Sequence, residues 1–397
     1  MGDERFERYL QAFEEDAPVS IRLNATKAQG MQPVEGEPVP WCREGYYLRQ
    51  RPSFTMDPLL HAGCYYVQEA ASMFLDEVLR QMHNAYISHQ PSAIRPLAAL
   101  DLCAAPGGKS TLMRVALPED CVLYSNEPIR QRASILAENV QKWGASNHFV
   151  TNLYPRDYRK AKMKFDLILC DVPCSGEGMF RKDPATISEW SPQQVEKCWQ
   201  LQRDIISDIW PCLNEGGMLI YSTCTFNTKE NEENIRWILE NYDAEVVPVE
   251  TQPEWNITGS LLDGFTEPVY RFIPGISRGE GLFLCVLRKK GITARPQRDY
   301  GSLPTRLRLV ANEITARQDG PLPEVELTYQ DALKFLRGEA LMLPSDTPRG
   351  LVEVTFLGHP LGTMKNIGSR ANNLYPKPWR IKTTHTPNDY EAILRHT

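Results

Sequence analysis

Two cysteines are the residues of this sequence best suited to covalent chemistry. Cys174 stands in the stretch Asp-Val-Pro-Cys-Ser-Gly-Glu-Gly at 171–178, and Cys224 stands in Tyr-Ser-Thr-Cys-Thr at 221–225. A thiolate is a strong nucleophile, so two thiols beside Asp171 suggest covalent addition to an electrophilic ring carbon. Free cysteines are also among the most buried residue types, so a purely structural role for either one is the alternative interpretation.

Each cysteine follows an apolar run that predicts a β-strand. Residues 165–170 precede Asp171 and Cys174, and residues 217–222 precede Cys224. The carboxyl ends of parallel strands meet at one edge of a sheet, and open α/β sheets bind their ligands there. If these two strands are neighbours, both thiols and Asp171 lie together at that edge.

Strand and helix patterns alternate from residue 97 onward. Such alternation requires crossover connections and predicts an α/β fold with a parallel, doubly wound sheet of six or seven strands. The expected strands are 98–103, 122–125, 148–151, 165–170, 217–222 and 282–287, and the expected helices are 110–117, 130–143, 193–213 and 229–241. The residues with candidate chemistry all follow the end of a strand.

A glycine-rich turn, Asp-Leu-Cys-Ala-Ala-Pro-Gly-Gly-Lys-Ser at 101–110, follows the first strand of that sheet. Its two glycines let the backbone approach a ligand closely, and the helix that it opens offers unpaired N–H groups to a carboxylate. Glu127 ends the second strand, where an acidic side chain typically accepts hydrogen bonds from ribose hydroxyls. The pattern is neither Gly-x-Gly-x-x-Gly nor a P-loop. It predicts a nucleoside-bearing cofactor, with NAD and S-adenosylmethionine both open.

The next two strand ends distinguish these cofactors. Hydride transfer needs neither an Asp-x-Pro-Cys motif nor a second thiol. Methylation of a pyrimidine at C5 needs a thiolate that adds to C6, because C5 is a poor nucleophile until then, and a nearby acid that shares a proton with ring N3. Cys224 and Asp171 meet these two demands. An amino-group methyltransferase would need a motif such as Asn/Asp-Pro-Pro-Tyr, whereas residues 172–175 read Val-Pro-Cys-Ser.

The motifs at 101–110, 171–178 and 221–227, in this order and spacing, resemble the Sun/nucleolar-protein family of RNA 5-methylcytosine methyltransferases, over about residues 20–290. The tail, with Leu361-Gly362 and Asn-Leu-Tyr-Pro-Lys at 373–377, resembles the PUA-like module of the bacterial 16S ribosomal RNA methyltransferase F group. The resemblance implies a Rossmann-like S-adenosylmethionine-dependent methyltransferase sheet with an antiparallel last strand. It also implies a small amino-terminal α+β cap and a β-rich PUA-like carboxyl-terminal domain.

The resemblance implies the activity as well: methylation of cytosine C5 in RNA, with S-adenosylmethionine as donor. Small-subunit (16S) ribosomal RNA or the 30S subunit is the expected substrate, and transfer RNA is the alternative. A non-catalytic RNA-binding or ribosome-assembly factor that keeps the fold is a further alternative. That alternative would leave Asp171, Cys174 and Cys224 unexplained.

The family assigns the attacking thiol to the later motif, hence Cys224. Cys174 would then help the product to leave, as the base that removes the C5 proton or by assisting elimination. The order matters because DNA cytosine methyltransferases use the Pro-Cys thiol as nucleophile, and that thiol is Cys174 here. Asp171 is expected near both cofactor and base, and Glu127 at the ribose.

The methionine part of the cofactor is expected along the turn. The residues concerned are Cys103, Ala104, Ala105, Pro106, Gly107, Gly108 and Lys109. Many relatives carry an Asp after the third strand that contacts the adenine, whereas this chain reads Asn-Leu-Tyr-Pro-Arg-Asp at 152–157. Asn152 and Asp157 are therefore both candidates for the adenine contact.

Positive charge is concentrated in the last part of the chain. Residues 288–397 hold 17 Lys and Arg against 11 Asp and Glu, although the whole chain has a net charge of -6. A basic tail beside an acidic body permits contact with phosphates. The expected RNA contacts are Arg22, Arg181, Lys182, Lys365, Lys377 and Arg380. The expected domains are an amino-terminal RNA-contacting cap at 1–57, a catalytic domain at 58–290, a linker at 291–310 and a PUA-like RNA-binding domain at 311–397.

Composition excludes several other classes of protein. At 397 residues the chain is long enough for two or three domains. No apolar run approaches the roughly 20 residues that span a bilayer, and the first residues lack the features of a signal peptide, so a cytoplasmic protein without membrane contact is expected. The ten cysteines include no Cys-x-x-Cys pair, so free thiols and no metal site are expected. The protein is expected to be a monomer.

Overall fold

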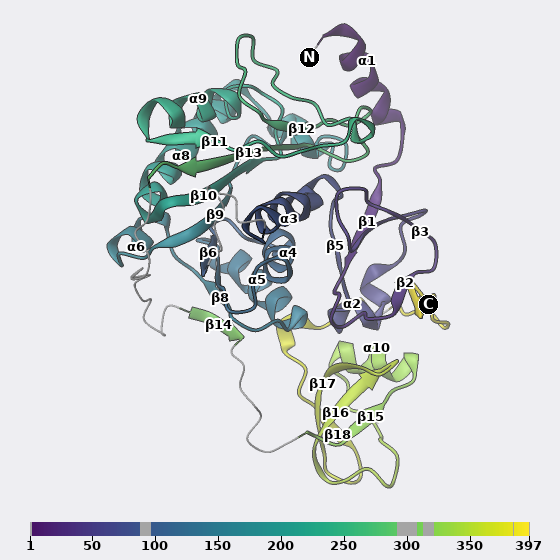
Figure 1. Ribbon diagram of the computed structural model, residues 1–397. Helices are drawn as coiled ribbons and strands as arrows, with labels where there is room; N and C mark the ends of the chain where they lie inside the picture. Colours follow the sequence, from purple (N-terminus) through teal and green to yellow (C-terminus); the bar gives the residue numbers. More distant parts are fainter. Residues whose placement is uncertain (1, 88–96, 292–307, 313–320, 384, 397) are drawn as a thin grey trace.

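The computed structural model describes residues 2–87, 97–291, 308–312, 321–383 and 385–396. A nine-stranded sheet forms its centre, with the strand order β11-β13-β10-β9-β6-β7-β8-β14 and with β12 paired to β13 (Figure 1). The strands are β6 (Ala98–Asp101), β7 (Val122–Asn126), β8 (His148–Thr151), β9 (Phe165–Asp171), β10 (Leu213–Thr223), β11 (Ala244–Val246), β12 (Tyr270–Phe272), β13 (Leu282–Lys289) and β14 (Arg308–Asn312).

The five strands from β6 to β10 pair in parallel, and β13 runs antiparallel to β10. This confirms the predicted α/β sheet with an antiparallel last strand. The sequence did not predict β11, β12 or β14, three short antiparallel strands at or near the sheet edges. Edge strands lack the long apolar runs that mark the buried strands of a parallel sheet.

Helices cover both faces of this sheet. The helices α3 (Phe74–Ile87), α4 (Gly108–Ala116) and α5 (Arg130–Trp143) lie in succession on one face. On the other face lie α6 (Pro155–Lys160), α8 (Pro192–Ile209) and α9 (Glu232–Asn241), while α7 (Ala185–Glu189) follows the loop after β9. None of the helices in the described part of the chain combines the length and apolar character needed to span a lipid bilayer.

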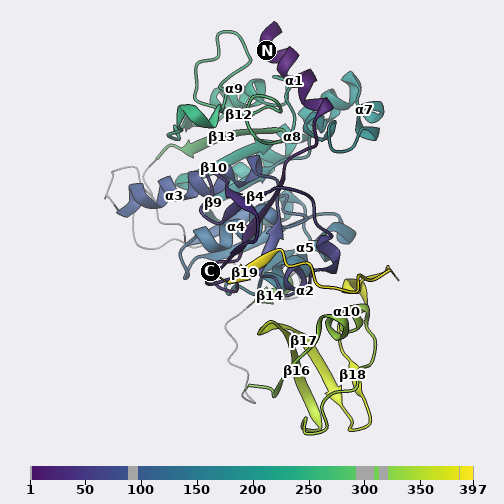
Figure 2. The same ribbon diagram turned by 90° about the vertical axis from the view of Figure 1, so that its right-hand side faces the viewer.

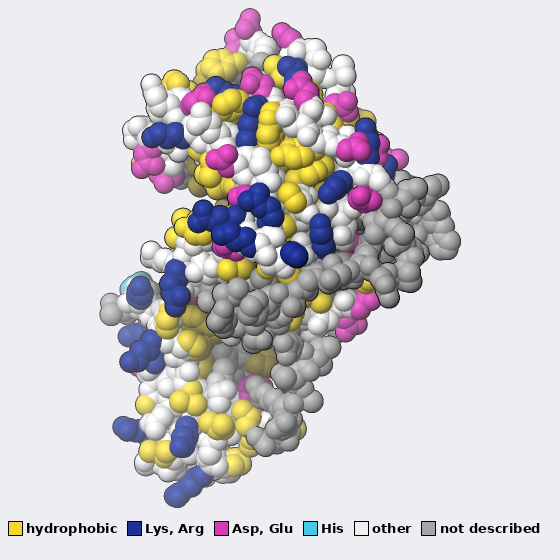
Figure 3. Space-filling model, turned by 90° about the vertical axis from the view of Figure 1, so that its left-hand side faces the viewer, with side chains coloured by type: hydrophobic (Ala, Val, Ile, Leu, Met, Phe, Trp, Pro, Cys, Tyr) yellow, Lys and Arg dark blue, Asp and Glu magenta, His cyan; other side chains and the backbone are white. Residues whose placement is uncertain are grey.

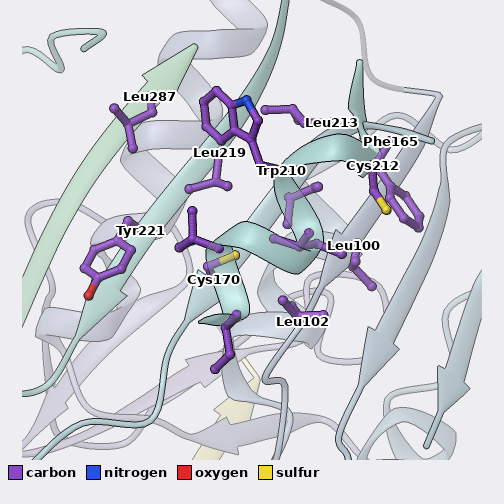
Figure 4. Close-up of a cluster of buried hydrophobic side chains, with 14 of the residues drawn as sticks. Leu100, Leu102, Phe165, Cys170, Trp210, Cys212, Leu213, Leu219, Tyr221 and Leu287 are labelled. Carbon is purple, nitrogen blue, oxygen red and sulfur yellow. The ribbon is translucent and has the colours of Figure 1, made fainter. Parts of the chain in front are cut away.

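The side chains of the buried strands alternate between these two faces, as the two-residue period of a strand requires. Leu100, Ile168 and Leu219 pack with α8 and α9 in one cluster. Figure 4 shows part of that cluster, in which Leu100, Leu219 and Trp210 lie close to the strands. The neighbouring residues Ala99 and Ile220 pack with α3 and α4 in another cluster. The sheet is therefore buried on both faces, and its carboxyl-terminal edge is rigidly placed.

The amino-terminal cap is a second, antiparallel sheet with the order β3-β4-β1-β5. Its elements are α1 (Asp3–Gln11), β1 (Val19–Leu23), β2 (Met31–Pro33), β3 (Gly36–Pro38), β4 (Gly45–Leu48), α2 (Pro58–His61) and β5 (Tyr65–Val67). The cap contains both helix and strand, as expected of a small α+β cap. The edge strand β5 lies beyond residue 57, the predicted end of the cap, yet it pairs with β1.

The carboxyl-terminal module is β-rich, as predicted, and also contains a helix. It contains β15 (Glu324–Glu326), α10 (Tyr329–Arg337), β16 (Gly350–Phe356), β17 (His359–Asn366) and β18 (Ala371–Asn373). The chain then returns to the cap, where β19 (Leu394–His396) pairs with β2 (Figures 1 and 2). Cap and module are thus joined by backbone hydrogen bonds.

A common hydrophobic core also joins the cap and the module. Leu23 and Leu59 of the cap belong to the same buried cluster as Phe335 and Leu394. Asp57 of the cap accepts hydrogen bonds from the Tyr65 hydroxyl at 2.8 Å and from the hydroxyl of Tyr390 at 3.2 Å. These contacts predict that the two parts stabilise each other.

Replacing Leu394 by alanine tests that coupling. Leu394 is 2% exposed in the common core, so Leu394→Ala is expected to lower the free energy of unfolding by about 2–5 kcal/mol. The rate of alkylation of Cys64, a cap residue buried in the same core, should rise as stability falls. Leu374→Ala is the control, because Leu374 is 50% exposed in the same module, and it should change stability by no more than about 0.5 kcal/mol. If the cap and the module were independent, Cys64 would remain protected from alkylation in Leu394→Ala.

Candidate active site

The structure brings the two candidate cysteines into contact. The Sγ atoms of Cys174 and Cys224, fifty residues apart in sequence, lie 3.2 Å from each other. The parallel pairing of β9 and β10 causes this, because it sets Asp171 opposite Ser222 and so aligns the loops that follow. The main chain closes the contact: the Gly178 amide donates to the Cys224 carbonyl at 2.7 Å, and a side chain at 178 would overlap that oxygen.

An ion pair stands beside the thiols. Lys109, in the first turn of α4, places its Nζ 2.8 Å from Oδ2 of Asp171, and the Ser222 hydroxyl donates to Oδ1 at 2.7 Å. Burial alone would lower the pKa of Lys109, but the Asp171 carboxylate outweighs it and raises that pKa. Lys109 therefore stays a cation next to the cysteine pair.

The two thiols have opposite proton affinities. The hydrogen bond from Cys174 lowers the pKa of Cys224 against the effects of burial and of the Asp171 charge, and the Lys109 cation assists. The hydrogen bond to Cys224, together with burial, raises the pKa of Cys174. Because the thiolate is the reactive form of a cysteine, this geometry favours Cys224 as the nucleophile.

The turn at residues 103–109 lines a cavity of about 180 Å³ beside this pair. Its walls come from β5 and the loop after it, from the turn, and from the ends of β6 and β9. They are Tyr66, Val67, Gln68, Glu69, Ser72, Asp101, Cys103, Ala104, Ala105, Pro106, Gly108, Lys109 and Asp171. Gly107, the residue just before α4, has a φ of +118°, a backbone conformation that favours glycine.

One buried oxygen in this cavity fits a cationic ligand. The Ser110 hydroxyl donates to Oδ2 of Asp101 at 2.5 Å, while Oδ1 of Asp101 is buried with no hydrogen-bond partner among the described residues. Burial raises the pKa of Asp101 to about 7, against the Ser110 hydrogen bond. An amino group of a ligand would satisfy the oxygen, which fits the amino acid end of an S-adenosylmethionine molecule.

Glu127 and Asn152, two of the residues expected to contact the nucleoside, directly follow β7 and β8. Oε1 of Glu127 accepts a hydrogen bond from the Ile129 amide at 3.0 Å, and Oε2 lies 3.3 Å from Arg132. Asn152 donates to the carbonyl of Glu127 at 2.6 Å, which holds it against the end of β7. Asp157 accepts from the Tyr154 amide at 3.0 Å and caps α6. Asn152 is thus the candidate beside Glu127, while Asp157 has a structural partner.

Three of the six expected RNA contacts, Lys182, Lys365 and Lys377, are exposed, and Arg380 is half-buried. Arg22 was expected to contact RNA, but its side chain is buried. It donates hydrogen bonds to Gln68 and Thr111 and stacks on the Trp143 ring. Arg22 therefore links the cap to α4.

Arg181 likewise faces inward. It pairs with Glu280 in the interior and donates to the Ala12 carbonyl, which anchors the segment after α1. The sequence could not reveal these burials, because the partners lie roughly 50 to 170 residues away along the chain.

Sequence reasoning missed the residues that hold the two cysteine loops together. Glu177 accepts from the amides of Phe226 at 2.7 Å and Asn227 at 2.9 Å. The fully buried ion pair of Glu232 and Arg271 supports the same loop, since Arg271 also donates to the Phe226 carbonyl at 2.8 Å. The available signal was the charged run Glu-Asn-Glu-Glu at 230–233, which begins six residues after Cys224.

Positive charge gathers on one face of the molecule. Figure 3 shows Lys and Arg side chains grouped in the middle of that face and again on the carboxyl-terminal module below. The helix α6, on this side in Figure 1, and the turn after it carry exposed cations with few acids between them. These cations are Arg156, Arg159, Lys160 and Lys162.

Three family models match successive parts of the chain. Residues 95–288 match the model described as 16S rRNA methyltransferase RsmB/F. Residues 1–70 match the N-terminal domain of 16S rRNA methyltransferase RsmF, and residues 322–381 match the methyltransferase RsmF PUA domain. Together these matches cover the cap, the parallel strands of the large sheet and most of the carboxyl-terminal module.

Individual proteins agree with these models. The ribosomal RNA small subunit methyltransferase F of Pectobacterium atrosepticum is 33% identical over 316 residues, 75% of this chain and 62% of that protein. The protein of the same name from Shigella flexneri is 29% identical over 94% of this chain and 92% of its own.

Solved structures share the fold. A methyltransferase homolog from Pyrococcus horikoshii is 27% identical with a TM-score of 0.59, over 72% of this chain and 91% of its own. NSun6 from the same organism, solved with SFG, has the same fold at 19% identity, a TM-score of 0.56, and coverage of 74% and 96%. The chain belongs to the 16S rRNA methyltransferase RsmB/F family, and it is an S-adenosylmethionine-dependent RNA 5-methylcytosine methyltransferase with amino-terminal and PUA domains of the RsmF type.

Proposed function

We propose that this protein methylates C5 of a cytosine in 16S ribosomal RNA through a covalent bond between Cys224 and C6 of that base. The observation that carries the proposal is the cysteine pair, 3.2 Å apart, beside the Lys109–Asp171 ion pair at the cofactor edge of the sheet. A site for chemistry on a base must receive a nucleotide that has left its stack. The RsmF-type PUA domain supports an RNA substrate, and β5 of the cap lines the cofactor cavity.

The first step is attack by Cys224. The thiolate forms a bond to C6, and the electrons of the C5–C6 double bond move toward C5 and the ring nitrogen N3. Asp171, held by Lys109 and Ser222, would share a proton with ring N3 as negative charge develops there, and the Lys109 cation next to it would offset that charge. When bound along residues 103–109, S-adenosylmethionine supplies the methyl group that C5 takes up.

The second step releases the product. The proton on C5 is removed, the electrons of its bond restore the C5–C6 double bond, and the sulfur of Cys224 leaves as a thiolate. Cys174 is the group next to that sulfur. Its thiol assists the elimination by donating a hydrogen bond to the departing Cys224 thiolate, or it serves as the base after its own proton has passed to solvent.

The remaining cofactor contacts are assigned by position. Asp101 would hold the amino group, Glu127 the ribose hydroxyls and Asn152 the adenine. Lys182, Lys365 and Lys377 are exposed and would contact RNA phosphates. Action in the cytoplasm on ribosomal RNA or on the 30S subunit follows from this substrate.

Alanine variants of the two cysteines should fail in different ways. Cys224→Ala should lower methyl transfer by at least about 10³-fold, because it removes the nucleophile. Cys174→Ala should instead accumulate a covalent complex with RNA, which denaturing gel electrophoresis of the protein with labelled 16S rRNA would detect.

Cys121→Ala is the matched control, since Cys121 is a buried cysteine in the loop before β7, away from the site. It should methylate RNA normally and form no stable complex. Full activity of Cys224→Ala would exclude the assigned nucleophile. Absence of any complex in Cys174→Ala would exclude its role in release.

The buried Asp101 carboxyl predicts a pH-dependent cofactor affinity. A cationic amino group favours the ionised carboxylate, so binding should release the proton that Asp101 holds below its raised pKa of about 7. The ratio of the affinities of the parent protein and Asp101→Asn for S-adenosylmethionine should therefore rise roughly 10-fold from pH 6 to pH 8. Calorimetry would measure it.

Asp263→Asn, at an exposed position, is the control and should match the parent at each pH. A ratio that stays constant with pH would mean that Asp101 does not contact the amino group.

Bisulfite sequencing identifies the substrate, because 5-methylcytosine resists conversion. Ribosomal RNA from a strain that lacks this protein should lose resistance at one or more 16S cytosines, and the parent gene but not Cys224→Ala should restore it. Loss of resistance in transfer RNA alone would contradict the 16S assignment.

A further inference from the structure

Beneath the cysteine pair lies a carboxylate that the mechanism above does not use. Glu230 is fully buried, and it follows Cys224 by six residues. Among the described residues no Lys or Arg forms an ion pair with it, and the donors that contact it are all uncharged. They are the Ser175 amide at 3.0 Å, the Ser175 hydroxyl at 2.5 Å, Gln202 Nε2 at 2.7 Å and Asn227 Nδ2 at 2.7 Å.

These contacts bridge the two catalytic loops. Ser175 directly follows Cys174, and Asn227 belongs to the loop after Cys224. The same two loops also meet where the Ser175 and Thr225 hydroxyls lie 3.0 Å apart. Gln202 ties Glu230 to α8 and also donates to the Pro173 carbonyl at 2.8 Å. The carboxylate is thus the shared acceptor that sets the positions of both thiols.

A buried charge without a cationic partner is expensive, and a neutral side chain could accept several of the same hydrogen bonds. The structure nevertheless holds a carboxylate here, which points to a role for the charge itself. Negative charge near a thiol favours the protonated form, and two of the donors to Glu230 belong to Ser175, the residue next to Cys174. The charge of Glu230 bears on both thiols, whereas the Lys109 cation lowers the pKa of Cys224.

We propose that Glu230 is a positioning residue that aligns the two cysteine loops and keeps the shared proton on Cys174, so that Cys224 is the thiolate. The inference rests on the proposed function, because it concerns which thiol attacks the base. It gives a physical reason why the Pro-Cys thiol is not the nucleophile in this site. Glu230, bound to the residue after Cys174, and Lys109, whose charge lowers the pKa of Cys224, divide the roles.

Several groups bear on the ionisation of the pair from the elements packed around it. They are Lys109 on α4, Asp171 at the end of β9, Cys198 on α8, Tyr221 on β10 and Glu230 before α9. The hydrogen bond between the thiols raises the pKa of Cys174 most, with burial next and the charges of Cys224 and Glu230 after it. The Glu230 charge also raises the pKa of Cys224, behind the effects of burial and of Asp171. Each thiol must therefore be measured alone as well as in the pair.

The test is the pH dependence of alkylation by iodoacetamide, followed at each cysteine by mass spectrometry. In a Cys224→Ala background, Glu230→Gln should lower the pH midpoint for alkylation of Cys174 by about one unit, because it removes a nearby negative charge without changing size. In a Cys174→Ala background, the same change should shift the midpoint of Cys224 by less than half as much.

Glu177→Gln is the matched control. Glu177 is also a nearly buried carboxylate that bridges the same two loops, through Phe226, Asn227 and Trp190. It should lower stability and leave the Cys174 midpoint in place. The inference is overturned if Glu230→Gln leaves that midpoint unchanged, shifts both thiols equally, or acts no differently from Glu177→Gln.

The parent protein decides the matter if Glu230→Gln does not fold. At the pH where half of Cys224 is alkylated, Cys174 should remain largely unlabelled, and equal labelling would overturn the inference. Alkylation needs neither RNA nor methyl donor, so the result stands whether or not 16S rRNA is the substrate.

Discussion

The parallel pairing of β9 with β10 is the interaction on which the active site depends. It joins two loops that are fifty residues apart and leaves Sγ atoms of Cys174 and Cys224 in contact. The helices on both faces bury these strands, so their carboxyl ends have little freedom to separate. The same edge carries the turn that starts α4, and Lys109 of that turn links the cofactor cavity to the thiols through Asp171.

The electrostatic surroundings then give the two cysteines different roles. In an apolar pocket without other charges, a thiol and a thiolate would share the one proton between them with no preference for either sulfur. Here the Lys109 cation and the buried Glu230 carboxylate both bear on the pair, and the pKa of Cys224 is lowered while that of Cys174 is raised. Such separation of two titratable groups by their surroundings is how enzymes divide nucleophilic and acid–base work.

The sequence predicted what depends on local pattern. Long apolar runs marked the buried parallel strands, and the ends of those runs placed Asp171, Cys174 and Cys224 together. Short edge strands such as β11 were not predicted, because they lack such runs. The burial of Arg22 and Arg181 was also missed, since a guanidinium is buried only where distant groups such as Gln68 and Glu280 happen to meet it. The Glu230 contacts belong to the same class of long-range information.

The central claim is that Cys224 attacks the base, and peptide mapping of a trapped complex tests it most directly. RNA in which cytidine is replaced by 5-fluorocytidine cannot lose a proton from C5, so the covalent complex should persist after methyl transfer. Digestion and mass spectrometry of the parent protein should find the nucleotide attached to Cys224, with Cys174 unmodified. Attachment at Cys174 would contradict the account.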